Sequence, residues 1–147
     1  MAKYLAVVNS KQPIETAFDY LSDLTNLEEW DPGVSEAKLV EGSNHGLAGK
    51  YAVKANRANL EYEITVLDKP NHLGFQAKTR FFTSVDHIYF KKTETGCEVT
   101  YDALLELNGP LSFLDFALKK MFKRIGDKAA TGLAEALDGE VTEAKLA

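Results

Sequence analysis

One long amphipathic segment near the C-terminus, residues 109–138, constrains the fold of this chain more than any other feature. Plotted at about 100° per residue, its apolar side chains gather on one narrow arc, which predicts an α-helix with one buried face. The residues on that arc are Leu114, Leu118, Met121, Ile125, Ala129, Gly132 and Ala136. If the helix is continuous from Pro110, it is roughly 43 Å long at about 1.5 Å per residue. Such a helix has to cross an entire domain of 147 residues.

The middle of the chain changes to the period of two that is typical of β-strands. Leu60, Tyr62 and Ile64 alternate with Glu61 and Glu63, which predicts one dry and one wet face. We expect strands at residues 3–10, 35–41, 50–57, 59–68, 73–79, 82–91 and 97–107, and short helices at residues 14–21 and 24–30. The connections between successive strands are short, so the strands pair antiparallel. The chain is therefore expected to form an α+β fold in one domain, residues 1–147, with a frayed tail at residues 139–147.

Composition argues against several functional classes. A formal charge of -5 argues against a nucleic-acid surface covering the protein. The lone Cys97 excludes an internal disulfide framework, and the three histidines lack the spacing of metal ligands. We therefore expect no metal and no cofactor. The N-terminus carries Lys3 and no apolar signal region, and no apolar run is long enough to span a membrane, which indicates a cytoplasmic protein.

Four short stretches carry a resemblance to a known family. They are residues 12–15 (QPIE), 17–23 (AFDYLSD), 30–33 (WDPG) and 96–101 (GCEVTY). Through them nearly the whole chain resembles the SRPBCC superfamily of START-like helix-grip proteins, and within it the polyketide cyclase/dehydrase and lipid-transport group. The resemblance implies a curved seven-stranded antiparallel sheet around the C-terminal helix, with an apolar cavity between them. Members of the family include binders, transfer proteins and a minority of enzymes, so the fold does not settle the function.

The candidate site is built around Asp86, and the strand register decides whether Asp86 or His87 faces the cavity. With tight hairpins, Phe90 lies opposite Cys97, and Asp86 lies opposite Tyr101 on the inner face. An inward Asp86 would have a raised pKa and act as a general acid or base with Tyr101 as its partner. The alternatives are a purely structural hydrogen bond, which is the more frequent role of such groups, or a register that turns Asp86 to solvent.

The function expected from these features is binding or transport of an apolar or amphipathic small molecule that is lipid- or polyketide-like. The expected cavity has a volume of roughly 300 to 1,000 Å³, and no reaction is required. The residues expected to line it are Tyr51, Val53, Tyr62, Ile64, Phe75, Asp86, Ile88, Tyr101, Leu105, Leu118, Met121 and Ile125. The alternative is a polyketide cyclase or dehydratase in which Asp86 and Tyr101 are the catalytic pair.

A second alternative is a module that contacts a membrane surface or another protein. Phe113 and Phe116 lie off the apolar arc of the last helix. They are accompanied by four basic residues, Lys119, Lys120, Lys123 and Arg124. These side chains suit an anionic membrane surface. The competing interpretation, which the sequence favours, is that the first strand or a neighbouring subunit covers the two phenylalanines. The sequence determines neither the oligomeric state nor the identity of the ligand.

Overall fold

A single antiparallel sheet of eight strands organises the protein. The computed structural model describes residues 1–147 apart from the side chain of Ser112. The strands are β1 (Ala2–Ser10), β2 (Val34–Glu41), β3 (Lys50–Ala55), β4 (Ala58–Asp68), β5 (His72–Lys78), β6 (Phe82–Lys92), β7 (Cys97–Leu107) and β8 (Gly139–Leu146). They follow the order β2-β3-β4-β5-β6-β7-β1-β8. The helices are α1 (Ile14–Ser22), η1 (Leu24–Asn26), α2 (Leu27–Trp30), η2 (Gly109–Leu114) and α3 (Asp115–Ala136).

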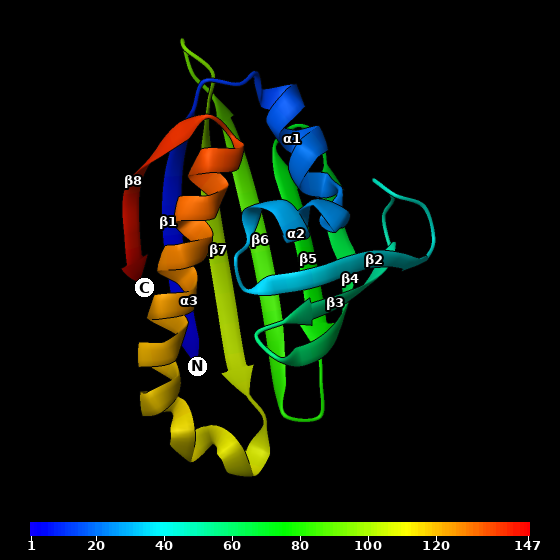
Figure 1. Ribbon diagram of the computed structural model, residues 1–147, viewed down its shortest axis with the longest axis vertical. Coiled ribbons are helices and arrows are strands. Elements are labelled where there is room, and N and C mark those ends of the chain that lie inside the picture. Colours follow the sequence, from blue (N-terminus) through cyan, green and yellow to red (C-terminus); the bar gives the residue numbers. More distant parts are fainter.

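The helices α1, α2 and α3 lie on one face of this curved sheet, its inner face. Figure 1 shows α3 running alongside β1 and β8, while α1 and α2 lie over the part of the sheet that contains β5 and β6. The sheet therefore buries one face, and the strands alternate accordingly. In β4, Ile64 is buried and Glu61 is exposed. The predicted α+β helix-grip arrangement is confirmed.

The β6–β7 hairpin has a different register from the predicted one. Phe90 pairs with Val99, where Cys97 was expected, and Asp86 pairs with Ala103. The reason is that β6 extends to Lys92, so that residues 93–96 form the turn and every pair moves by two positions. Because the shift is an even number, Asp86 still faces inward and His87 faces outward.

The C-terminal helix is shorter than predicted, and it buries a partly different face. Residues 109–114 form the 3-10 helix η2, and α3 begins only at Asp115. Leu114 and Met121, predicted to be buried, are 43% and 52% exposed. The buried face of the C-terminal half instead includes Ala130 and Leu133, because α3 packs there against β1 and β8. Helical structure depends on such tertiary packing more than on propensity, so the unpacked first turns deviate from α-helix.

The tail predicted to fray is a strand. β8 pairs antiparallel with β1, from Ser10 opposite Gly139 to Tyr4 opposite Leu146. A β-strand on the outer side of β1 satisfies backbone groups that would otherwise remain at an open edge, and this explains why the tail is ordered despite its mostly exposed side chains. No helix in the described part of the chain is long and apolar enough to cross a membrane.

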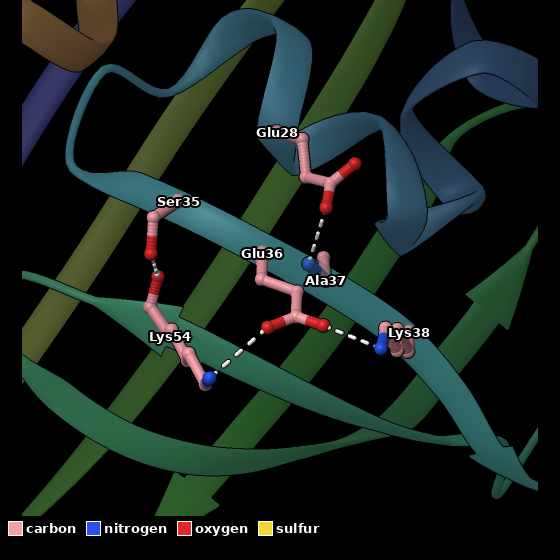
Figure 2. Close-up of polar contacts among 6 residues, drawn as sticks. All are labelled: Glu28, Ser35, Glu36, Ala37, Lys38 and Lys54. Atoms are coloured by element: carbon pink, nitrogen blue, oxygen red, sulfur yellow. Dashed lines mark hydrogen bonds and ion pairs between the residues drawn. The ribbon is translucent and has the colours of Figure 1, made fainter.

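The opposite edge of the sheet is held by α2. Figure 2 shows Glu28 of α2 beside β2, where its Oε1 accepts a hydrogen bond from the backbone N–H of Ala37 at 3.0 Å. Glu36 bridges Lys38 and Lys54, at 2.6 Å and 3.1 Å, and thereby links β2 with β3. These contacts fix the connection between α2 and β2, which contains Asp31.

Candidate functional site

A cavity of about 240 Å³ lies between the inner face of the sheet and α3. Its walls come from β1, the five strands β3 to β7, the region from α2 to the start of β2, and α3. Most of the lining is apolar, for example Leu60 and Phe75 on the sheet and Phe122 on the helix. Met121 also lines the cavity and is half exposed, so it lies at the mouth. The cavity is smaller than the predicted range.

The polar groups of the cavity form one hydrogen-bonded network around Asp86. The Tyr101 hydroxyl donates to Asp86 Oδ1 at 2.7 Å, and the Ser84 hydroxyl donates to Oδ2 at 3.3 Å. The Tyr62 hydroxyl lies 3.2 Å from Ser84 Oγ and extends the network to β4. Asp86 itself is only 3% exposed. A carboxyl group is therefore held in a dry pocket by hydroxyl groups of three neighbouring side chains.

Burial changes the protonation of this network. It raises the pKa of Asp86 to about 7, although the hydrogen bonds from Tyr101 and Ser84 oppose the change. Burial also raises the pKa of Tyr101 well above its ordinary value, with the negative charge of Asp86 as a second cause. The Tyr101 hydroxyl therefore stays protonated, and Asp86 exchanges a proton close to neutral pH.

A second carboxyl group, that of Asp31, also faces the cavity. Asp31 follows α2 directly, and its Oδ1 accepts the backbone N–H of Gly33 at 2.9 Å. Burial raises the pKa of Asp31. Its negative charge also contributes to the raised pKa of Asp86. The charge of Asp31 thus acts on Asp86, although the two residues come from distant parts of the chain.

The predicted cavity residues divide into two groups. Those that line the cavity are Tyr62, Phe75, Asp86, Tyr101, Leu105, Met121 and Ile125. Those that do not are Tyr51, Val53, Ile64, Ile88 and Leu118, all of which are buried elsewhere. The first four of that second group belong to the large core cluster that also contains Phe18 and Leu21 of α1. A ligand-binding role for the seven lining residues stays a prediction.

Several cavity residues were missed by sequence reasoning. Ser84, Leu60 and Ala103 share the strand face of residues that were predicted, so the alternation contained the signal for them. Asp31 was not predicted to line the cavity, because turn formation alone accounts for the sequence Asp-Pro-Gly at residues 31–33. Trp30 is a core residue, 2% exposed, whose ring packs edge-on against Tyr101 at 5.9 Å between centroids.

The histidines and the cysteine lie apart from this network. His72 Nε2 and His87 Nδ1 are 2.9 Å apart on the outer face of the sheet, and His45 Nδ1 lies 2.8 Å from Ser22 Oγ. Cys97 is buried, and burial raises the pKa of its thiol. Among the described residues, no cluster of three or more His, Cys, Asp or Glu side chains is arranged to hold a metal ion.

Comparisons with solved structures support the fold. A START superfamily protein from Mycobacterium smegmatis has a TM-score of 0.74 and 12% identity, over 94% of this chain and 98% of that one. A protein from Thermus thermophilus has a TM-score of 0.69 and 19% identity, over 92% and 96% of the two chains. The di-domain ARO/CYC StfQ of the steffimycin biosynthetic pathway has a TM-score of 0.68 and 12% identity, over 92% of this chain and 49% of that one. At these identities the similarity concerns the fold alone.

Comparisons of sequence give the family. A search of curated proteins found no significant match. The family described as polyketide cyclase/dehydrase and lipid transport matches residues 1–138. This match covers nearly the whole chain and agrees with the START-like architecture. The chain therefore belongs to the polyketide cyclase/dehydrase and lipid transport family, and its fold is START-like.

Proposed function

We propose that this protein binds or carries an apolar or amphipathic small molecule, lipid- or polyketide-like, in the cavity between the sheet and α3. The observation that carries the proposal is the cavity itself, with apolar walls and one cluster of polar groups around Asp86. Apolar walls that desolvate a ligand, together with a few polar groups that orient it, are the usual composition of a small-molecule site. Cytoplasmic location remains part of the proposal.

Native mass spectrometry of protein purified from its own host tests this proposal. We expect a co-purified mass that is lost when the cavity is filled by Ala103→Phe, since Ala103 lies in the cavity wall. Ala52→Phe is the matched control, because Ala52 lies on β3 of the same sheet and is exposed. Absence of any bound mass, together with failure to take up an apolar dye, would sink the proposal.

An acid–base enzyme acting on a polyketide-like or aromatic ketone is the second candidate. The observation in its favour is the 2.7 Å hydrogen bond between Tyr101 and a carboxyl group whose pKa is about 7. Such a carboxyl group can remove a proton next to a carbonyl near neutral pH, while a tyrosine hydroxyl stabilises the enolate oxygen. If a turnover is found and Asp86→Asn leaves it intact, Asp86 is not the base.

A membrane-contacting surface is the third candidate. Phe113 and Phe116 are 76% and 91% exposed, so β1 does not cover them. Phe81, in the β5–β6 turn, is also exposed. It lies at the same end of the molecule, since its carbonyl oxygen accepts a hydrogen bond from the backbone N–H of Asn108, just before η2. The nearby exposed lysines of α3, Lys119 and Lys120, complement an anionic lipid surface. We propose an anionic membrane as the partner of this surface, with a second copy of the chain as the competing occupant.

A further inference from the structure

The cavity has a one-sided charge composition. Two carboxyl groups, those of Asp31 and Asp86, face it, and among the described residues none with a positive charge lines it. The remaining polar side chains around Asp86 are hydroxyl groups: Tyr62 on β4, Ser84 on β6 and Tyr101 on β7. An apolar ligand brings no charge that could compensate the carboxylates, so the head group of the ligand decides the electrostatic balance.

Both carboxyl groups keep capacity for a further hydrogen bond. Asp86 accepts one hydrogen bond on each oxygen, and an ionised carboxylate accepts about four in total. Asp31 Oδ1 accepts Gly33 N–H, and within the described residues its Oδ2 has no hydrogen-bond partner. A head group with several N–H donors therefore matches what the cavity offers. A carboxylate head group would meet two groups of its own charge in a site with little water.

The apolar walls determine the rest of the ligand. A volume of about 240 Å³ corresponds to about eight water volumes at about 30 Å³ each. This favours a short aliphatic or single-ring body over a long lipid chain that is wholly enclosed. Met121 lies at the exposed mouth, so a longer body would extend past it toward solvent.

We infer that the cavity selects ligands with a protonated amine head group on a compact apolar body, and that it rejects carboxylates of the same size. The inference rests on the proposed function, binding of a small amphipathic molecule in this cavity, and names the ligand class. The amine lies between Asp31 and Asp86 and donates to both carboxylates. The apolar body contacts Phe75 and Leu60 on the sheet and Phe122 on α3.

Octylamine, octanol and octanoate test the inference, because their straight alkyl chains differ by at most one methylene while their head groups differ in charge. One methylene is worth about fourfold in affinity, less than the difference expected from the head groups. Calorimetric titration at pH 7.5 is expected to show octylamine binding at least about tenfold more tightly than octanoate, with octanol between them. Asp86→Asn is expected to weaken octylamine about tenfold and to change octanol less than about twofold. Glu61→Gln is the matched control, because it removes the same charge from an exposed position of β4.

A second readout does not depend on the variant folding normally. Near pH 6 Asp86 is largely protonated in the free protein, since its pKa is about 7. An amine that binds the ionised carboxylate therefore releases a proton, whereas octanol does not. Titration in two buffers with different ionisation enthalpies measures this release, and octylamine binding without proton release contradicts the inference.

The outcomes separate the two proposals. The amine inference is overturned if octanoate binds as tightly as octylamine, or if Asp86→Asn and Glu61→Gln change the affinity for octylamine equally. In either case, binding of octanol still supports the proposed function. If none of the three probes binds and an apolar dye also fails, the proposed function is wrong and the amine inference falls with it.

Discussion

At the scale of single residues, Asp86 illustrates how a carboxyl group can be kept inside an apolar fold without a cation. Three hydroxyl groups surround it, and two of them donate to its oxygens directly. Hydroxyl donors stabilise the ionised form, but they do not cancel the cost of removing a charge from water. The pKa of Asp86 is therefore raised to about 7 in the folded protein.

This raised pKa predicts a specific pH dependence of stability. Between about pH 4 and pH 7 the folded state holds a proton on Asp86 that the unfolded state has lost, because the ordinary pKa is 3.8. The free energy of unfolding therefore decreases as pH rises through this window, by up to about 4 kcal/mol for a shift of about three pKa units. Urea unfolding at pH 4.5 and pH 8 should show this loss for the wild type.

The comparison with Asp86→Asn isolates that contribution. Asparagine keeps the shape but does not titrate, so the stability of the variant relative to wild type should increase with pH. Asp31, whose pKa is also raised, titrates in both proteins and cancels in the difference to first order. If the free energies of unfolding of the two proteins change with pH in parallel, the raised pKa of Asp86 is contradicted.

At the scale of elements, α3 is shaped by two close approaches. A Cβ at Gly126 would lie 2.6 Å from ring carbons of Tyr4, a fully buried residue of β1. A Cβ at Gly132 would overlap the backbone carbonyl oxygen of Trp30. Gly132 thus allows a close approach of α3 to α2, and Gly126 allows a close approach of α3 to the sheet. These contacts position α3 over the cavity.

Alanine substitutions at these glycines should lower stability to different extents. Each alanine gains about 1 kcal/mol in helix propensity, and overpacking costs about 1 to 3 kcal/mol or more. Gly132→Ala should be the more destabilising, because a backbone carbonyl cannot rotate away as a ring can. Urea unfolding measures both, with exposed Lys128→Ala as a control that stays within about 0.5 kcal/mol of wild type. A Gly132→Ala protein as stable as wild type would show that α2 and α3 separate easily.

Strand β8 supports a second prediction at this scale. Deleting residues 139–147 removes the partner of β1 and leaves an unpaired edge strand. We expect the free energy of unfolding to fall by more than about 2 kcal/mol, from several lost backbone hydrogen bonds, and the chain to self-associate. Sedimentation velocity and urea unfolding measure these effects. Glu143→Ala, which changes only an exposed side chain of β8, is the control; a truncated protein that is monomeric and equally stable refutes a structural role of β8.

At the scale of the whole molecule, the mouth of the cavity at Met121 and the exposed aromatic residues lie at the same end. Met121 belongs to the mouth, and Phe116 lies little more than one helical turn before it on α3. A protein with a formal charge of -5 nevertheless carries several exposed lysines at this end. This surface thus lies beside one exposed part of the cavity wall.

Binding to anionic vesicles tests the membrane assignment. We expect co-sedimentation with phosphatidylserine vesicles, little with neutral vesicles, and loss of binding as salt rises, because surface charges are screened beyond about 8 Å at physiological ionic strength. Phe116→Ser should abolish binding, while Leu47→Ser, an exposed apolar residue in the β2–β3 connection, should not. Equal binding to anionic and neutral vesicles would contradict a role in binding anionic membranes. If the protein self-associates and Phe116→Ser prevents this, the surface binds a second copy of the chain instead.

The sequence by itself determined the elements and their faces, because periodicity records which side of each strand and helix is dry. Tyr62, Phe75, Asp86 and Tyr101 were therefore placed correctly on the inner face despite a register error of two residues. The start of α3 and the strand β8 escaped prediction, since both depend on what packs beside them. Local pattern does not contain that information.

Only the tertiary structure decided where the cavity lies along the inner face. Ile64 and Ile88 are buried in the core and do not line the cavity, although they lie on the same strand faces as the cavity residues Tyr62 and Asp86. Asp31, from the turn after α2, lines the same cavity as Asp86 of β6. A one-dimensional pattern specifies the face of a side chain, whereas the space opposite that face is set by elements far away in the chain, and this space determines whether a ligand has room to bind.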